Sequence, residues 1–566
     1  MNLLIKNASV MDVIKDSEYS ADIYIKDGFF EKIESDINVE DIEKDGAFNI
    51  IDAEGQTAIP GLIDAHTHVE LSMLSSSSFA EALLANGTTA AVLDPHDAVN
   101  VLGHKGAKYL MEEMAETDLT PVWMASPCVP SAPGYEDCYG QIMLSDVKTM
   151  IEEYDMYGIA EAMDYNRVIS GEESLAEILS YGRENNLKID GHAPCVRGDD
   201  LNTYIKAGIS SDHESVTVEE QLEKFNKGMY VIIRRGSLKE PANAADLLKL
   251  TGDSPRILLS TDGCITAKDM LEHGHMNYAV AQLVEEGVSP LQAVKMASLY
   301  PAKAYGLEKY GAIAKGYKAD LALIKDKKDF KVSKVIINGK NVPTSYPRSS
   351  FPKEVINSIH HRLLTAEDIS IPLPIKDGHV KVNIMQITDG TLATVHETRI
   401  LSVSDNHLIL DDDLMYCAVI DRYRENGSIG VGIISNAGAL DGALAGSIAQ
   451  DTQNLIAFGN SFSDIIYALN MVIKKQGGVS FVRKEKEEFF LALPVLGILS
   501  QEPIESFVKE SDKLIEEIKK HGCILNNPLL TMSLQIPLAV IPEMAITNRG
   551  LLDISNQIFI PVCEPV

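Results

Sequence analysis

Short apolar runs alternate with amphipathic helical patterns through the middle of the chain, at about residues 59–307. Helical patterns such as 175–186 and 218–227 separate most of these runs. Eight runs are strand candidates, at 58–63, 88–93, 121–125, 158–161, 188–191, 208–212, 229–234 and 256–261. Eight strand–helix units in roughly 250 residues have the size and rhythm of a (β/α)₈ barrel. We therefore predict an α/β protein whose central domain, 59–307, is a TIM-like barrel.

The sequence on both sides of this block is rich in β-type residues. Strand-like runs occur at 3–5, 21–25 and 29–33, and again at 320–324 and 334–337. The last run leads into Asn338-Gly339, a strong hairpin-turn signal. We expect 1–58 and 308–345 to form one small β-domain. Prolines then punctuate the chain, and we predict a separate C-terminal α+β domain at 346–566, with strands near 430–434 and 454–458 and helices near 462–475 and 504–520.

Charge and cysteine content indicate which partners and which cellular location to expect. Fifty Lys and Arg against 82 Asp and Glu give a formal net charge of −32, so we expect no nucleic-acid partner. The seven cysteines include no C-x-x-C pair, which argues against a disulfide framework or a cysteine zinc site. The first residues lack a signal-peptide pattern, and no run of about 18 apolar residues occurs. We therefore expect a cytoplasmic protein that does not contact membranes.

The sharpest local signal is His66-Thr67-His68, which follows the first predicted strand. Alternate residues of a strand share a face, so both imidazoles should point the same way. In isolation such a pair is often a structural pair of histidines. At the rim of a barrel, where catalytic groups gather, two aligned imidazoles indicate a metal chelate.

Further candidate ligands stand at the ends of later predicted strands. Glu161 ends the fourth strand, His192 and His213 follow the fifth and sixth, and Asp262 follows the eighth. A carboxylate inside an apolar strand needs a compensating charge, and Glu161 could supply this by bridging two cations about 3.5–4 Å apart. A structural ion pair is the alternative for Glu161. Asp262 could bind a metal and also accept a proton from an attacking water.

Together these motifs resemble the amidohydrolase superfamily and, within it, the adenine deaminase family. The likeness covers nearly the whole chain. It rests on the segments 66–73, 94–97 (Asp-Pro-His-Asp), 190–194, 211–214, 311–321, 427–432 and 529–533. The resemblance implies two divalent metal ions, with manganese or iron favoured and zinc as an alternative. It also implies an aminopurine substrate, with hydrolysis of adenine to hypoxanthine and ammonia, and the size and domain plan suit a homo-oligomer.

The resemblance also suggests individual roles. Its metal-site motifs fall on His66, His68, Glu161, His192, His213 and Asp262. We assign catalytic roles to Asp262, Glu161 and His96, with Asp262 moving the proton. We name five further residues as substrate-contact candidates: Glu70, Glu214, Arg234, Gln450 and Gln453.

Four positions depart from the family's usual pattern. Gly263 stands where a second acid is usual, and Tyr423, Gln450 and Gln453 stand where histidines are usual. A glutamine amide forms hydrogen bonds but does not titrate near neutral pH, so substrate recognition could differ. Two alternatives therefore remain: an amidohydrolase acting on another aminated heterocycle or a cyclic amide, and a non-catalytic paralogue that binds a purine.

Overall fold

The computed structural model describes residues 2–44, 46–238, 242–541 and 543–566. It divides into two compact units, and each contains segments from separate parts of the sequence. The first unit comprises Met1–Pro95, Leu110–Pro127 and Val147–Ser349. The second unit comprises His96–Tyr109, Cys128–Asp146 and Ser350–Val566. Helices α4 (His104–Met114) and α5 (Leu144–Lys148) each contain a boundary between the units.

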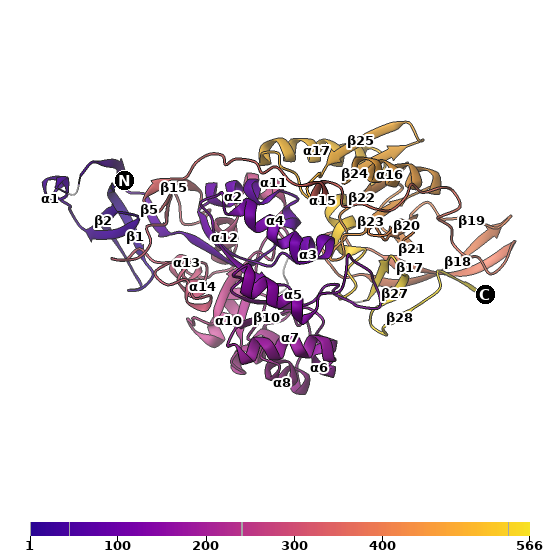
Figure 1. Cartoon of the computed structure of the whole chain (residues 1–566), viewed down its shortest axis with the longest axis horizontal. Coiled ribbons are helices and arrows are strands. Elements are labelled where there is room, and N and C mark those ends of the chain that lie inside the picture. Colours follow the sequence, from indigo (N-terminus) through magenta and orange to yellow (C-terminus); the bar gives the residue numbers. More distant parts are fainter. Residues whose placement is uncertain (1, 45, 239–241, 542) are drawn as a thin grey trace. The chain divides into compact units, whose positions relative to one another are not determined.

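One sheet of the first unit is built from both flanks of the sequence (Figure 1). Its strand order is β16-β15-β14-β5-β1-β2-β3, with β4 beside β1. Asn338 and Gly339 join β15 to β16 with φ angles of 49° and 74°, the left-handed conformation that an Asn-Gly hairpin turn requires. The strands are β1 (Asn2–Asp12), β2 (Ser17–Lys26), β3 (Phe29–Glu34), β4 (Phe48–Asp52), β5 (Thr57–Pro60), β14 (Leu321–Ile324), β15 (Val332–Ile337) and β16 (Lys340–Asn341).

The rest of the first unit alternates parallel strands with helices, as the periodicity predicts. Five strands pair in the order β10-β9-β8-β7-β6, and three more pair as β11-β12-β13. Their bounds are β6 (Leu62–Thr67), β7 (Thr88–Leu93), β8 (Thr120–Ala125), β9 (Gly158–Ala162), β10 (Lys188–Gly191), β11 (Ser211–Asp212), β12 (Tyr230–Arg234) and β13 (Ile257–Ser260). β6 and β7 are buried along their whole length, as expected for parallel strands covered on both faces.

Helices connect these strands and cover them. They are α2 (Ser76–Ala85), α6 (Tyr165–Ser170), α7 (Glu173–Glu184), α8 (Gly198–Lys206), α9 (Val218–Asn226), α10 (Ala244–Thr251), α11 (Ala267–Glu272), α12 (Met276–Glu285), α13 (Pro290–Met296) and α14 (Leu299–Ala304), with the short turns η1 (Glu70–Ser72) and η2 (Thr149–Glu153). The short helix α1 (Val39–Glu43) belongs instead to the flanking sheet, between β3 and β4. Side chains at N-caps explain several of the starts. Thr217 accepts from the backbone N–H of Glu220 at the start of α9, and Asn243 does the same for Asp246 at α10.

One predicted strand boundary is wrong. The apolar run 58–63 belongs to two elements, because β5 ends at Pro60 in the flanking sheet and β6 begins at Leu62 in the parallel sheet. Gly61 lies between them, and a Cβ atom there would lie 2.2 Å from Thr89 Oγ1. The prediction failed because two consecutive buried strands give one continuous apolar run. As a result His66 lies within β6 rather than after it.

The second unit is built on a mixed sheet that α16 covers. The order is β19-β18-β17-β21-β20-β23-β22-β24-β25, with β29 beside β17. The strands are β17 (Gly378–Gln386), β18 (Val395–Ser404), β19 (His407–Leu408), β20 (Leu414–Ile420), β21 (Ile429–Ser435), β22 (Ala443–Gly446), β23 (Leu455–Gly459), β24 (Gly478–Arg483), β25 (Glu487–Ala492) and β29 (Cys563–Pro565). A smaller sheet contains β26 (Met544–Thr547), β27 (Gly550–Asp553) and β28 (Ile558–Phe559).

The helices of the second unit include two long amphipathic ones. In α17 (Ile504–Lys520), the apolar residues Phe507, Val508, Leu514 and Ile518 are buried at helical spacing. α16 (Phe462–Lys475) packs against the main sheet through a buried apolar face. The other helical segments are α3 (His96–Leu102), α15 (Lys353–Ile356), α18 (Pro528–Leu530) and η3 (Thr531–Gln535).

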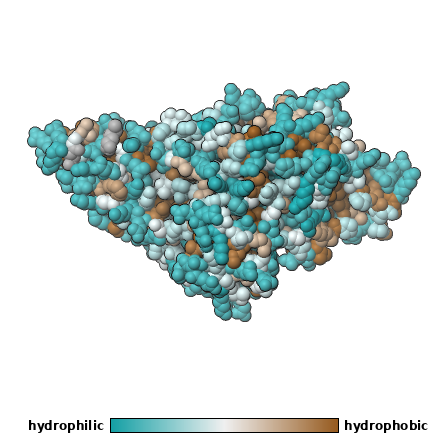
Figure 2. All heavy atoms as spheres, in the orientation of Figure 1, coloured by the Kyte–Doolittle hydropathy of each residue, from teal (hydrophilic) through white to brown (hydrophobic). Residues whose placement is uncertain are grey.

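The face of the molecule seen in Figure 2 is predominantly polar. Figure 2 shows hydrophilic residues over most of the visible face, with hydrophobic residues scattered among them. A long apolar helix of the kind that crosses a bilayer does not occur in the described ranges.

Candidate metal centre in the first unit

Four histidines and two carboxylates gather in the first unit, although they come from five separate places in the sequence. His66 and His68 lie at the end of β6, Glu161 lies in β9, and Asp262 follows β13. One ligand atom from each of these four lies within 4.8 Å of the others. The same holds for Glu161 with His192 and His213, which follow β10 and β11. All six residues are buried.

The first group has the spacing of ligands around one ion. Asp262 Oδ1 lies 3.1 Å from His68 Nε2 and 3.3 Å from His66 Nε2. Glu161 Oε1 lies 3.4 Å and 3.6 Å from the same two nitrogens. Ligand atoms that each lie about 2.0–2.2 Å from a metal ion are roughly 3.0–3.6 Å from one another. These side chains therefore fit a divalent cation without rearrangement.

The second group uses the other oxygen of Glu161. Its Oε2 atom lies 2.9 Å from His192 Nδ1 and 3.3 Å from His213 Nε2. The two oxygens of one carboxylate thus face two separate histidine pairs. Nε2 atoms of His66, His192 and His213 are buried and form no hydrogen bond, which is unusual for polar atoms unless a ligand binds them. This donor set fits a two-metal centre bridged by Glu161.

A backbone contact sets the tautomer of His68. Its Nδ1 atom lies 2.9 Å from the carbonyl oxygen of Asp94. A carbonyl can only accept a hydrogen bond, so Nδ1 carries a proton, and in the neutral imidazole Nε2 is the atom left to bind a cation placed between Asp262 and Glu161. Asp262 is held in place by its own backbone N–H, which donates to the carbonyl of His66 at 2.9 Å.

Without a metal ion, protons on the imidazoles balance the carboxylates. Burial raises the pKa of Glu161, but the close imidazoles of His192 and His213 outweigh it and hold that pKa well below its ordinary value. Burial lowers the pKa of His192, yet the charges of Glu214 and Glu161 raise it to about 9. Metal binding would displace these protons, since a histidine ligand must be neutral.

Arg234 and Glu214 stand beside this centre. Arg234 Nη1 donates to Glu214 Oε1 and, at 2.6 Å, to Asp262 Oδ2. Glu214 Oε1 is also 3.9 Å from His192 Nδ1. The neighbouring Arg235 pairs instead with Glu286 at 2.5 Å. Glu70, the remaining candidate in this unit, is buried in η1, just after His68.

A fully buried lysine that sequence reasoning missed supports the second histidine pair. Lys224 Nζ, on α9, donates to Asp212 Oδ2 at 2.9 Å and to the carbonyl of Ala193 at 2.7 Å. Asp212 Oδ1 in turn accepts from the N–H of Ala193 at 2.8 Å. Ala193 follows His192 and Asp212 precedes His213, so these contacts join the two histidine-bearing strand ends. The sequence carries no clear signal for it, because Glu220 and Gln221, its neighbours at helical spacing, are polar as well.

Comparison with known proteins identifies the family of this chain. The profile of the amidohydrolase family matches residues 57–342, and that of the adenine deaminase C-terminal domain matches residues 391–557. Adenine deaminase of Archaeoglobus fulgidus is 35% identical over 98% of this chain and 94% of its own length. The chain belongs to the adenine deaminase family. The Bacillus licheniformis adenine deaminase is 34% identical, over 99% of this chain and 96% of its own. Among solved structures, E. coli guanine deaminase is 15% identical with a TM-score of 0.46, covering 62% of this chain and all of its own.

The other candidates of this adenine deaminase family member lie in the second unit. Gln453 Nε2 donates to Gln450 Oε1 and to Asp97 Oδ1, both at 2.8 Å. His96 is the neighbour of Asp97, and its Nε2 atom lies 3.3 Å from Asp97 Oδ1. The predicted site residues are therefore divided between segments of the two units.

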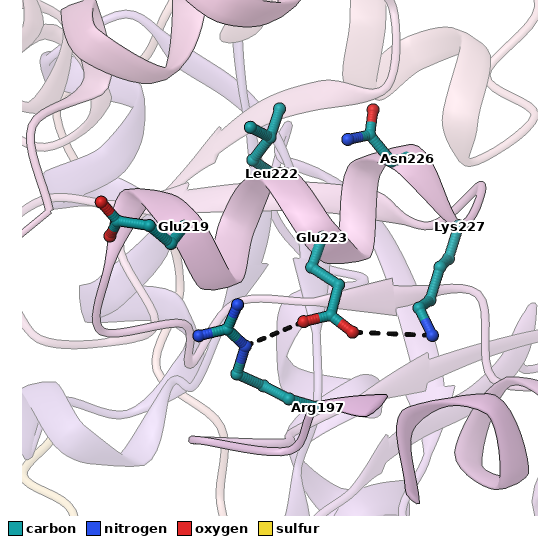
Figure 3. A pocket seen from close by; sticks show the side chains of 6 residues that line it. All are labelled: Arg197, Glu219, Leu222, Glu223, Asn226 and Lys227. Carbon is teal, nitrogen blue, oxygen red and sulfur yellow. Dashed lines mark hydrogen bonds and ion pairs between the residues drawn. The ribbon is translucent and has the colours of Figure 1, made fainter. Parts of the chain in front are cut away.

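A surface cleft on α9 carries none of the predicted site residues (Figure 3). It is lined by Arg197, Glu219, Leu222, Glu223, Asn226 and Lys227. Glu223 lies between the two cations, 2.8 Å from Arg197 Nε and 3.5 Å from Lys227 Nζ. Arg197, Glu223 and Lys227 therefore already pair with one another.

Proposed function

We propose that this chain hydrolyses adenine to hypoxanthine and ammonia at a centre of two divalent cations. One observation carries the proposal: the two oxygens of Glu161 face two separate histidine pairs, in a chain that belongs to the adenine deaminase family. We propose His66, His68, Glu161 and Asp262 as ligands of one cation. Glu161, His192 and His213 would hold the other. Manganese or iron is favoured and zinc is an alternative, because imidazole and carboxylate ligands suit all three.

We also propose that the eight parallel strands close into a (β/α)₈ barrel at 59–307. Two backbone hydrogen bonds support closure between the two groups of strands. Ser210 N–H donates to the carbonyl of Ile189 at 2.9 Å, and Asp262 N–H donates to that of His66 at 2.9 Å. The β-domain of 1–58 with 308–345 and the C-terminal domain of 346–566 complete the proposed division. Cytoplasmic location and homo-oligomer formation stay predictions.

In this proposal Asp262 moves the proton. Two bound cations would supply a water molecule of lowered pKa as nucleophile for the ring carbon that bears the amino group. Asp262 accepts the proton of that water and donates it to the departing nitrogen, which leaves as ammonia. Its Oδ1 atom faces His66 and His68, while Arg234 holds Oδ2 at 2.6 Å. The carboxylate is thereby fixed in one orientation, which lowers the entropy cost of reaching the reactive geometry.

Glu214 and Arg234 are the proposed substrate contacts in the first unit. Adenine is neutral and presents both N–H donors and ring-nitrogen acceptors, so a carboxylate and a guanidinium can each bind one edge of the ring. Both side chains are largely buried, at 6% and 10% exposure, where hydrogen bonds discriminate strongly between analogues. Glu70 is a further candidate. Substrate contact by His96, Gln450 and Gln453 stays a prediction.

Ammonia release tests the proposal directly. The metal-free chain would be loaded with Mn²⁺, Fe²⁺ or Zn²⁺ and given adenine, guanine, cytosine and a cyclic amide such as dihydrouracil. We expect adenine to yield equal amounts of hypoxanthine and ammonia. Asp262→Asn serves as the matched control, since activity from a contaminating deaminase would persist in that preparation. Release of ammonia from another base alone, or ring opening of the amide, would instead establish the alternative that Gly263, Tyr423, Gln450 and Gln453 suggest. If none of these compounds reacts, the result favours the remaining alternative, a non-catalytic paralogue that binds a purine.

A further inference from the structure

The second unit contains its own cluster of a histidine and two acids. His96 and Asp97 begin α3, and Asp451 lies in the loop between β22 and β23. One ligand atom from each lies within 4.8 Å of the others. His96 Nε2 is 3.3 Å from Asp97 Oδ1 and 3.5 Å from Asp451 Oδ1. The exposed fractions are 5%, 0% and 5%, so water cannot solvate these charges.

The charges in this cluster do not balance. Two carboxylates face one imidazole, and in the described residues neither Asp97 nor Asp451 forms an ion pair with a lysine or arginine. Arg422, also fully buried in this unit, is committed to Ser358 and to backbone carbonyls such as that of Leu496. Buried carboxylates without a compensating charge are strongly unfavourable. A cation is therefore the partner that the cluster lacks.

Unpartnered atoms point to the same conclusion independently. Asp97 Oδ2, Asp451 Oδ2 and Gln450 Nε2 are buried and form no hydrogen bond. Native proteins seldom leave such atoms unsatisfied. Gln453 holds the neighbouring amide and carboxylate oxygens in place, since its Nε2 donates to Gln450 and Asp97. The free Oδ2 atoms leave both carboxylates able to bind a cation in addition to the contacts of their Oδ1 atoms, and the free amide N–H of Gln450 suits a water molecule that the cation retains.

We propose that His96, Asp97 and Asp451 bind a divalent cation, in addition to the cations of the Glu161 centre. The spacing of 3.3–3.5 Å between the imidazole nitrogen and the two carboxylate oxygens is that of ligands on one ion. One imidazole with two carboxylates and a water favours Mn²⁺ or Fe²⁺ over a thiophilic ion. His96 is then a metal ligand rather than a residue that contacts the substrate. The proposal does not depend on which reaction the first unit catalyses.

Metal counting tests it. The full-length chain would be stripped with a chelator, equilibrated with excess Mn²⁺, freed of unbound metal and analysed for Mn per chain. We expect the double variant Asp97→Asn/Asp451→Asn to bind one Mn²⁺ fewer than the natural chain. Asp421→Asn is the matched control, because Asp421 is also a buried acid of this unit but pairs with Arg424 at 2.6 Å. Equal counts in the natural chain and the double variant would overturn the proposal.

A variant with a disabled Glu161 centre allows the second-unit site to be tested independently of the proposed function. In a His66→Ala/His192→Ala chain, which lacks a ligand from each part of the Glu161 centre, we expect one Mn²⁺ to remain and to disappear on adding Asp97→Asn/Asp451→Asn. Unfolding temperatures measured with and without Mn²⁺ distinguish loss of the metal site from poor folding of a variant. Without metal, Asp451→Asn should unfold at the same or a higher temperature than its parent, because it removes a like-charge contact. With Mn²⁺ the order should reverse. A variant that is less stable by the same margin with and without Mn²⁺ would show a purely structural hydrogen-bonded triad.

Discussion

Lys224 Nζ lies 2.9 Å from Asp212 Oδ2, and neither side chain is exposed to solvent. This pair is positioned behind the centre, where it joins the residue before His213 to the residue after His192. A buried pair of this kind is costly to break on one side, because the remaining charge stays buried alone. The metal-binding geometry of the first unit therefore depends on a residue that contacts no metal candidate.

Replacing Lys224 by Met should weaken metal binding at the His192 and His213 side. We expect Lys224→Met to lose about 3–5 kcal/mol of stability and to retain one Mn²⁺ fewer per chain after dialysis against a weak chelator. Lys227→Met, at the C-cap of the same helix and partly exposed, is the control and should keep its full metal content. A Lys224→Met chain that is folded and retains all its Mn²⁺ would show that the pair only supports the fold. Lys224→Arg should rescue part of the loss.

Asp262→Asn should slow the reaction without weakening substrate binding. An amide cannot accept the proton of the attacking water, so we expect kcat for adenine to fall by about 10²–10⁴. The KM should change little. Steady-state assays with metal content measured in the same preparation give both quantities. Asp246→Asn, an exposed acid paired with Lys249, should leave kcat unaltered.

Arg234→Gln should affect substrate binding more than proton transfer. A hydrogen bond from a charged donor contributes about 1.5–3 kcal/mol, so kcat/KM should fall by about 10- to 100-fold, mainly through KM. The adjacent Arg235→Gln is a close control, because Arg235 pairs with Glu286 rather than with Glu214 and Asp262. If both variants raised KM equally, a general loosening of the β12 end would be the better explanation.

Glu172 gives an acid-dependent contribution to the stability of α7. Burial raises the pKa of Glu172, but hydrogen bonds from Arg167 and from the backbone N–H of Leu175 lower it from 4.5 to about 2. Because the folded-state pKa is the lower one, this stabilisation is present above about pH 4.5 and is lost as the pH falls towards 2. The side chain is 40% exposed, so solvent screening limits the effect to about 0.5–1 kcal/mol.

The test compares Glu172→Gln with the natural chain by hydrogen exchange of the α7 amides. Glutamine retains the N-capping oxygen and removes only the charge. We expect faster exchange in Glu172→Gln at pH 6–7, after correction for the intrinsic rate, and a much smaller difference near pH 2.5. Glu173→Gln removes a charge from the same turn and should show neither effect. A difference that persists unchanged at pH 2.5 would assign the effect to the cap and not to the ion pair.

The sequence indicates the candidate ligands because each one stands at a position that the local strand pattern marks. His66 and His68 share a face of β6, and each of the other four lies at or next to the end of a parallel strand, which is where barrel enzymes place functional groups. Lys224 could not be found in the same way. Its role depends on how α9 packs against two strand ends. The sequence around Lys224 predicts only that it belongs to a helix.

Other features also depend on packing that local patterns do not encode. The run 58–63 gave one predicted strand because β5 and β6 are both buried, although they belong to different sheets. Residues 96–109 and 128–146 lie within the strand–helix block of the sequence but pack with the second unit. Their own sequence does not identify the elements they pack against, since those partners are hundreds of residues away.

The segment 128–146 has a consequence for synthesis of the chain. Asp137 Oδ1 accepts a hydrogen bond from Arg549 Nη2 at 2.7 Å, and Asp137 O accepts one from Asn454 Nδ2 at 2.8 Å. Arg549 is added 412 residues after Asp137, roughly 20 to 80 s later at about 5–20 residues per second. During that interval the segment has left the ribosome without the residues that will bind it. The two units therefore cannot be completed one after the other from the N-terminus, and a fragment that begins at Ser350 would lack part of its own interior.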